Sequence, residues 1–165
     1  MSSEQLSTSR EVLVGEVDQH VVLAASLDTV WAAFARLEVR DRWFRMPGPR
    51  ESRTHELDFR VGGSEVATSV FPNIDREERL EHRGRFLDIV EKQRITSASE
   101  FRLDGVLKLV ALSTWQLTEV PEGVRAHYRE QYQFLEVIDD GTAERGERRG
   151  GTRFMLTGLK LAVES

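Results

Sequence analysis

The segment from Val124 to Leu135 carries the residues most able to do chemistry. Its even-numbered positions are apolar or aromatic except for one carboxylate: Ala126, Tyr128, Glu130, Tyr132 and Phe134. Because side chains alternate between the two faces of a strand, Glu130 is predicted to point into the interior with the two tyrosines. A carboxylate placed there must be paired, solvated by cavity water or raised in pKa, so Glu130 is a candidate ligand contact or general acid or base.

A structural role is the alternative for the same residues. Glu130 could pair with an arginine or satisfy backbone groups, and we favour this interpretation over a functional one. The hydroxyls of Tyr128 and Tyr132 could contact a ligand, but we favour rings that fill the core. Trp43 and Trp115 have helix-facing or sheet-facing spacing and are predicted to be core or cavity wall.

Other catalytic chemistry finds little support in the sequence. The four histidines are scattered, with no i, i+4 pair and no adjoining carboxylate cluster: His20, His55, His82 and His127. The absence of Cys excludes disulfides, thiolate zinc sites and a Cys nucleophile. Gly62-Gly63 precedes a strand rather than a helix, so it is predicted to be a turn and not a phosphate-binding loop. We therefore expect no metal and no cofactor.

Composition indicates a single globular domain. A chain of 165 residues that is 39% hydrophobic and 31% charged has the size and balance of one soluble core. The net charge of -5 disfavours nucleic-acid binding. The N-terminus lacks the basic and apolar regions of a signal peptide and no apolar run approaches the ~20 residues of a membrane span, so we expect a cytoplasmic protein. Residues 1–16 are predicted to be a flexible segment and residues 17–165 a single domain.

Hydrophobic periodicity predicts the elements that position these residues. A strand over residues 17–25 is followed by a helix capped by Ser26 and by a second short helix that ends at Phe44. Further strands are predicted over residues 57–61, 64–71, 83–90, 94–101, 106–120 and 124–135. Short turns between successive strands indicate an antiparallel meander.

The end of the chain is predicted to be a long buried helix. Over residues 152–164, polar residues form one narrow stripe and the rest is apolar, so most of the helix circumference should be buried. Residues 139–151 are rich in Gly and Arg and are predicted to be a loop, in which Gly150 and Gly151 form a mobile hinge. Three arginines of this loop are predicted to be solvated: Arg145, Arg148 and Arg149.

A series of short motifs stands in order along the chain: Val30-Trp31, Arg42-Trp43-Phe44, Asp58-Phe59-Arg60-Val61-Gly62-Gly63, Asp88-Ile89-Val90, Arg94-Ile95, Glu100-Phe101, Leu112-Ser113-Thr114 and Glu130-Gln131. With these motifs the chain resembles the SRPBCC superfamily (START-like, Bet v 1-like), in the branch of the Hsp90 ATPase activator C-terminal domain (AHSA1-like). The resemblance implies an α+β helix-grip fold. In that fold a curved antiparallel sheet of about six or seven strands surrounds a long C-terminal helix, with two short helices after the first strand.

The resemblance also implies a cavity between sheet and helix that binds a hydrophobic or amphipathic small molecule. Where related chains often carry aromatic residues, this chain has Ser97 and Ser99, which would make the cavity wider and more polar if they point inward. The residues expected to contact the ligand are Glu130, Tyr128, Tyr132, Trp115, Trp43, Ser97 and Ser99.

Two other functions stay open at this point. The first is an enzyme, such as a cyclase, dehydratase or hydrolase, with Glu130 as general acid or base. The second is a protein-interaction role like that of the Hsp90 activator, which we rank last because that activator carries an additional N-terminal domain. The oligomeric state is also open, with a homodimer among the alternatives.

Overall fold

The computed structural model describes residues 8–9 and 11–165. The helices are α1 (Leu27–Ala35), α2 (Leu37–Trp43), the 3-10 helix η1 (Arg50–Ser52) and α3 (Thr142–Glu164). The strands are β1 (Thr8–Ser9), β2 (Leu13–Leu23), β3 (Thr54–Leu57), β4 (Ser64–Pro72), β5 (Glu77–Val90), β6 (Arg94–Leu103), β7 (Val106–Val120), β8 (Gly123–Phe134) and β9 (Val137–Ile138).

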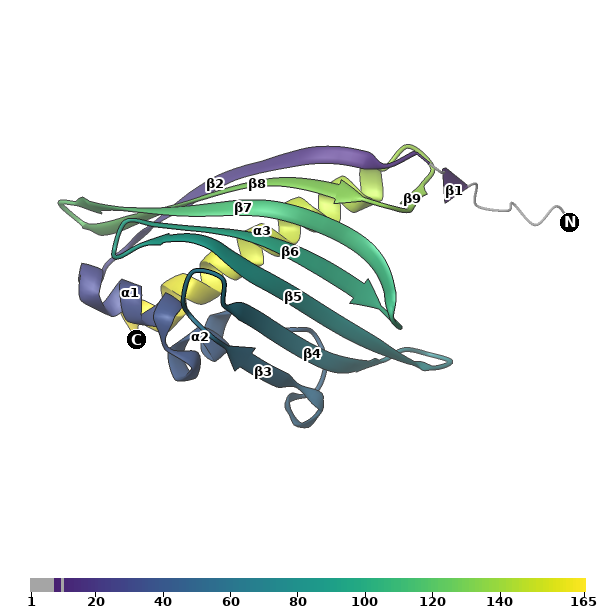
Figure 1. Cartoon of the computed structure of the whole chain (residues 1–165), viewed down its shortest axis with the longest axis horizontal. Coiled ribbons are helices and arrows are strands. Elements are labelled where there is room, and N and C mark those ends of the chain that lie inside the picture. Colours follow the sequence, from purple (N-terminus) through teal and green to yellow (C-terminus); the bar gives the residue numbers. More distant parts are fainter. Residues whose placement is uncertain (1–7, 10) are drawn as a thin grey trace, which may run out of the picture.

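The main sheet has seven strands in the order β2-β8-β7-β6-β5-β4-β3, and every neighbouring pair is antiparallel. Helix α3 crosses its inner face diagonally, and α1 and α2 cover the same face at one end (Figure 1). β1 and β9 form a separate pair. This arrangement confirms the predicted α+β helix-grip class, with two short helices after the first strand of the sheet.

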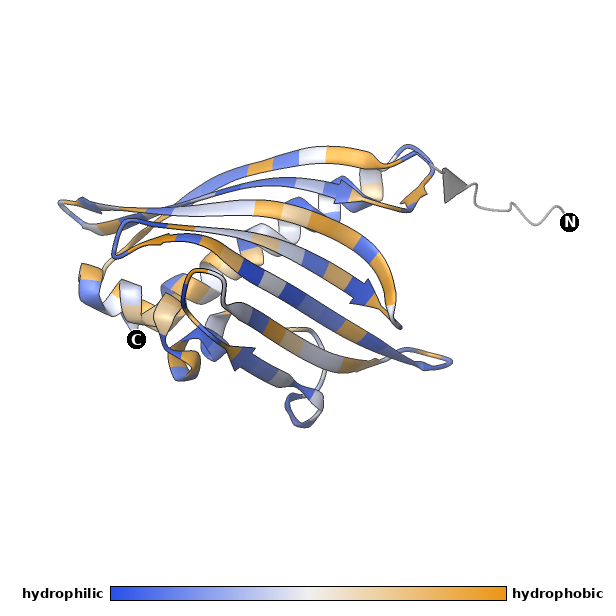
Figure 2. Ribbon diagram, viewed as in Figure 1, coloured by the Kyte–Doolittle hydropathy of each residue, from blue (hydrophilic) through white to orange (hydrophobic). Residues whose placement is uncertain are grey.

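Alternating burial along the strands separates an inner from an outer face. In β8 the even-numbered positions from Val124 to Tyr132 are buried, while most odd-numbered positions are exposed. Hydrophilic and hydrophobic residues are interspersed along the strands of the sheet (Figure 2). The inner-facing side chains form one core with α1 and α3, because period-2 alternation places every second residue on the same face.

The two short helices are positioned by local signals that the sequence carries. Ser26 caps α1, since its Oγ accepts a hydrogen bond from the backbone N of Thr29 at 3.2 Å. Phe34 is buried on the inner side of α1. The indole Nε1 of Trp43 donates to the carbonyl of Ala33 at 2.8 Å, which joins the end of α2 to α1.

The predicted strand over residues 57–61 is wrong. β3 ends at Leu57, and residues 58–63 form a loop in which the backbone N of Gly63 donates to the carbonyl of Arg60 at 2.8 Å. The misleading alternation has a physical cause. Phe59 packs against the core, with its ring 5.2 Å from that of Phe86, whereas Val61 is 56% exposed.

Two strands begin earlier than predicted. β2 begins at Leu13 rather than Val17, because Leu13 already pairs with Phe134 of β8. β5 begins at Glu77 rather than at residue 83, and Glu77 pairs with Pro72 at the end of β4. Residues 1–7 and 10 of the predicted flexible segment lie outside the described residues, and the mobility of that segment stays a prediction.

Helix α3 begins at Thr142, so most of the predicted loop over residues 139–151 is helical. Each glycine inside a helix costs roughly 1 kcal/mol relative to alanine, which is why the glycine-rich segment favoured a loop. Tertiary contacts outweigh this cost. Glu144 accepts a hydrogen bond from the backbone N of Ile138 at 2.7 Å, and Thr152 is buried.

The predicted burial of α3 over most of its circumference is also wrong. One face is buried through Thr152, Leu156, Leu159 and Val163, but Phe154 is 70% and Leu161 68% exposed. The sheet is curved but it does not close around the helix, so the outer side of α3 faces solvent (Figure 1). Among the described residues, none of the helices is long and apolar enough to cross a membrane.

Candidate functional site

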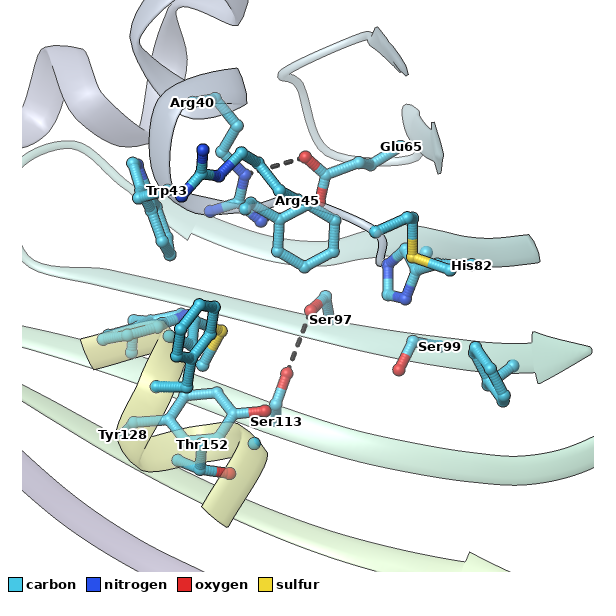
Figure 3. A pocket seen from close by; sticks show the side chains of 18 of the residues that line it. Arg40, Trp43, Arg45, Glu65, His82, Ser97, Ser99, Ser113, Tyr128 and Thr152 are labelled. Atoms are coloured by element: carbon cyan, nitrogen blue, oxygen red, sulfur yellow. Dashed lines mark hydrogen bonds and ion pairs between the residues drawn. The ribbon is translucent and has the colours of Figure 1, made fainter. Parts of the chain in front are cut away.

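A cavity of about 550 Å³ lies between the inner face of the sheet, α2 and α3. Aromatic and aliphatic side chains make up much of its wall, among them Trp43, Phe86, Ile95, Phe101, Leu109, Trp115 and Met155. Arg40, Arg45 and Glu65 lie on one side of the cavity, and Tyr128 and Thr152 lie on the opposite side (Figure 3). At the surface end, which we call the mouth, Arg45, Pro47 and Phe154 are exposed.

Short side chains on β5, β6 and β7 create the space. Gly84, Ser97, Ser99 and Ser113 line the cavity, where larger residues would fill it. The hydroxyls of Ser97 and Ser113 form a cross-strand hydrogen bond of 3.1 Å (Figure 3). The inward orientation considered for Ser97 and Ser99 is therefore present, and it adds polar groups to an otherwise largely apolar wall.

One wall of the cavity contains an ion cluster, which we call the Arg40 cluster: the buried side chains of Arg40, Glu65 and His55, together with the mostly exposed Asp41. Arg40 of α2 donates from Nε and Nη2 to the two carboxylate oxygens of Glu65 on β4, both at 2.7 Å. His55 of β3 lies between carboxylates, with Nε2 3.0 Å from Glu65 and Nδ1 3.0 Å from Asp41. Its two ring nitrogens both face acceptors, which favours the doubly protonated imidazolium.

The electrostatics of the Arg40 cluster follow from this geometry. Burial alone would raise the pKa of Glu65, but the charge and hydrogen bonds of Arg40 outweigh it and hold the pKa far below its usual range. Burial likewise opposes protonation of His55, yet the hydrogen bonds to Glu65 and Asp41 raise its pKa above the ordinary value. The guanidinium of Arg40 also lies over aromatic rings, 4.5 Å from the centroid of Trp43 and 4.7 Å from that of Phe44.

His82 of β5 lines the cavity next to this cluster (Figure 3). Its ring meets that of Phe44 edge-on at 4.8 Å. Burial lowers the pKa of His82 to about 4, and the positive charge of Arg40 acts in the same direction although Glu65 opposes it. His82 is therefore a neutral imidazole near pH 7, with polar nitrogens offered to the cavity.

The opposite wall contains a second buried ion cluster, the Arg148 cluster: Arg148, Glu130 and Tyr128. Arg148 of α3 donates from Nε and Nη2 to the two carboxylate oxygens of Glu130, and the hydroxyl of Tyr128 donates to the same carboxylate. Burial, followed by the charge of Glu130, raises the pKa of Tyr128, so the phenol stays protonated. The predicted pairing of Glu130 with an arginine is present, and the predicted solvation of Arg148 is wrong.

The structure brings together five of the seven residues expected to contact a ligand. Trp43, Trp115, Tyr128, Ser97 and Ser99 line the cavity. Their contact with a ligand stays a prediction.

The other two lie outside its lining. Glu130 is buried beneath Arg148 and Tyr128, which stand between its carboxylate and the cavity. Tyr132 packs over Gly15 of β2, where an added Cβ would lie 2.4 Å from the tyrosine ring.

Sequence reasoning missed the charged residues of the Arg40 cluster. Arg40 and Glu65 are 25 positions apart, and neither stands in a motif that signals a buried ion pair. No sequence signal marks Glu65 as buried: it shares the inner face of β4 with the small residues Ala67 and Ser69, so the hydrophobic pattern of the strand does not identify this face as the inner one. Within the described ranges, no group of three or more His, Asp or Glu side chains is placed to hold a metal ion.

Comparison with known proteins places the fold among bacterial relatives. A protein of Rhizobium leguminosarum described as uncharacterized is 28% identical over 96% of this chain and 98% of its own, with a TM-score of 0.76. A protein of Rhizobium loti is also 28% identical, over 92% of this chain and 99% of its own, with a TM-score of 0.74. An AHSA1-like protein from Aeromonas hydrophila shares the fold at 17% identity, over 91% of this chain and 92% of its own, with a TM-score of 0.59.

A comparison with curated proteins gives no match. The model of the family described as Activator of Hsp90 ATPase homolog 1-like protein matches residues 24–164. That range spans β3 to β8, α1, α2 and α3, so the match includes the cavity and both ion clusters. The resemblance drawn from the sequence motifs is thereby confirmed, and the chain belongs to the Activator of Hsp90 ATPase homolog 1-like family.

Proposed function

We propose that the protein binds a hydrophobic or amphipathic small molecule in the cavity between the sheet and α3. The cavity itself carries this proposal, since about 550 Å³ enclosed by aromatic, aliphatic and a few polar side chains is typical of a small-molecule site. Trp43 and Trp115 supply apolar wall, while Ser97, Ser99 and His82 supply hydrogen-bonding groups. A core built only for stability would be filled to close packing.

The position of Glu130 supports binding over acid-base catalysis by this residue. Its carboxylate accepts hydrogen bonds from Arg148 and Tyr128, and it does not line the cavity. A general acid or base must lie within hydrogen-bond reach of the group that it serves. The family description refers to activation of Hsp90, a role that would use an outer surface, and the cavity supports a small-molecule role instead.

The test uses N-phenyl-1-naphthylamine, a neutral apolar fluorophore whose emission rises in apolar surroundings. We expect saturable binding to the purified protein, with energy transfer from Trp43 and Trp115 because both line the cavity. Ser97→Leu should weaken binding by about tenfold or more, because the larger side chain occupies the cavity. The control is Thr118→Leu, at an exposed position of β7 outside the cavity.

Equal weakening by the two leucine variants, or no binding by the unaltered protein, would contradict the proposal. The folding stability of both variants is measured in urea, so that a loss of binding is not confused with a loss of structure. Native mass spectrometry of freshly purified protein gives an independent result, since a co-purifying apolar molecule that is absent from Ser97→Leu would support the proposal.

A further inference from the structure

We infer that the ligand of this cavity carries an anionic group, and that Arg45 and Arg53 bind it. The inference rests on the proposed function and adds the chemical class of the ligand. Both arginines lie on the segment between α2 and β3, and both line the cavity. The ligand that fits is an apolar organic anion, with a carboxylate, sulfonate or phosphate group near the mouth.

The charge balance of the cavity wall is the first argument. The charged residues that line it are Arg40, Arg45, Arg53, Glu65 and Arg148. Arg40 is neutralised by Glu65, and Arg148 is neutralised by Glu130 from behind the wall. Within the part of the chain that the structure describes, Arg45 and Arg53 take part in no ion pair. The wall therefore holds uncompensated positive charge, although the whole chain has a net charge of -5.

The state of the Arg53 side chain is the second argument. Arg53 is half-buried, and its Nε is fully buried without any hydrogen-bond acceptor. Buried donors of this kind are rare, because a buried N–H without an acceptor loses its hydration and gains nothing in return. Unsatisfied buried donors of this kind are expected at binding sites where a ligand supplies the missing hydrogen-bond acceptor. An anion near Arg53 would stabilise the positive charge of its guanidinium even if Nε stayed buried and made no hydrogen bond to that anion.

The surroundings strengthen such an interaction. A guanidinium binds carboxylate, sulfonate or phosphate oxygens through charged hydrogen bonds, and its planar shape lets two N–H groups bind two oxygens of the same anion. Phe44 and Met46 flank the same wall, and an apolar lining reduces the screening that water provides. Arg45 is exposed at the mouth and lies beside Arg40 (Figure 3), so an anion could meet Arg45 before the apolar body is buried.

A matched pair of probes tests the inference. The compound 8-anilino-1-naphthalenesulfonate has the same ring system as N-phenyl-1-naphthylamine but carries one sulfonate. We expect the anionic probe to bind about tenfold or more tightly than the neutral probe at low ionic strength. Arg45→Gln/Arg53→Gln should remove this preference, weakening the anionic probe by about tenfold more than the neutral probe. Added salt should weaken only the anionic probe.

The control variant is Arg125→Gln, which removes the same charge from an exposed position of β8 outside the cavity. It should leave the affinities of both probes unchanged. Arg53→Gln should have a larger effect than Arg45→Gln, because Arg53 is less exposed to solvent.

The possible outcomes separate the inference from the proposed function. If both probes bind with equal affinity, or if the double variant and Arg125→Gln weaken the anionic probe equally, the inference is overturned while the cavity remains a binding site. If neither probe binds, the proposed function fails and the inference fails with it. If the double variant weakens both probes equally, the arginines shape the site rather than bind an anion, which also overturns the inference.

Discussion

Both walls of the cavity contain an ion pair between an arginine and a carboxylate, but the two pairs differ in how far their side chains are exposed to solvent. In each wall, an arginine from a helix binds both oxygens of a carboxylate on the inner face of the sheet. In the Arg40 cluster both partners are nearly inaccessible, with 9% of the Arg40 and 3% of the Glu65 side chain exposed. In the Arg148 cluster the carboxylate is just as buried, but 29% of the Arg148 side chain is exposed.

The difference indicates which wall can move. Arg40 is held from several sides, by Glu65 and by the rings of Trp43 and Phe44, so α2 is fixed to the sheet. Arg148 belongs to the glycine-rich part of α3, and its side chain is more exposed to solvent than that of Arg40. We therefore expect the wall formed by α3 to yield when a molecule enters, while the wall formed by α2 keeps its shape.

The largest effect is expected from Arg40→Met. Removal of one partner from a buried ion pair leaves the other charge uncompensated, which typically costs about 3–5 kcal/mol of unfolding free energy. Urea denaturation measures the change. The control is Arg36→Met, because Arg36 forms an ion pair with Glu38 at 2.9 Å but both side chains are mostly exposed. If the two variants lose similar stability, the α2 wall is not fixed as we describe.

A smaller loss is expected from Glu130→Gln in the other wall. Glutamine keeps the shape and one acceptor, and the freed Arg148 can reach water, so about 1–3 kcal/mol is expected. The comparison with Arg40→Met uses the same urea titration. A loss as large as that of Arg40→Met would mean that both walls are equally rigid. Binding of the neutral probe should persist in Glu130→Gln, because Glu130 does not line the cavity.

The third effect is a dependence of stability on pH that originates at His82. Its pKa in the folded protein is about 4, below the ordinary value of 6.5, so the unfolded chain takes up the proton first as pH falls. The stabilising contribution is present above about pH 6.5 and is lost as pH falls toward 4. Through this group the unfolding free energy changes by up to about 1.4 kcal/mol per pH unit. His55 acts in the opposite sense, since its raised pKa stabilises the fold below the ordinary value and loses effect as pH rises.

His82→Phe tests this assignment. The substitution keeps a ring against Phe44 and removes the titrating group. We expect the unfolding free energy of the variant to change less between about pH 6.5 and pH 4.5 than that of the unaltered protein. An unchanged slope would assign the effect to other groups, such as Glu65 at the acidic end of the range.

The smallest effects concern the glycines of α3. An added Cβ at Gly150 or Gly151 would meet no atom within 4 Å, so alanine fits at both positions. Each substitution should raise the unfolding free energy by about 0.5–1 kcal/mol through helix propensity. If the α3 wall moves as we expect, Gly150→Ala/Gly151→Ala should also slow entry of the neutral probe in stopped-flow measurements.

Gly123→Ala, at the start of β8, should instead destabilise the protein, because Gly123 has a φ of 140° and a Cβ there would lie 2.0 Å from the carbonyl oxygen of Leu23.

The fold could be predicted where burial follows the simple periods. The alternation in β8 placed Glu130 and Tyr128 on the inner face, and Ser26 marked the start of α1. Prediction failed at α3, where Gly146, Gly150 and Gly151 lower the intrinsic helix propensity. The contacts that restore the helix come from Glu130 and Ile138, which lie outside the helical segment itself.

The candidate site was only partly predictable, for a related reason. In β4 the inner face carries Glu65, Ala67 and Ser69, while Val66 and Val70 lie on the other face. Hydrophobic alternation thus suggests the opposite orientation for this strand. Arg40 and Glu65 compensate each other only after α2 has packed on the sheet, so no local pattern reveals their pairing. The same applies to Arg45 and Arg53, whose lack of partners is a property of the folded protein.

The short side chains on β5 and β6 have a consequence for the diversity of such proteins. Gly84 and Ser99 line the cavity but belong to neither ion cluster, so this part of the lining is independent of the ion pairs that anchor α2 and α3. A change at Ser99 can therefore reshape the interior while α2 and α3 stay anchored. A protein built in this way can bind a different small molecule after exchange of one or two of these short lining residues on β5 and β6, while the ion pairs that anchor α2 and α3 stay intact.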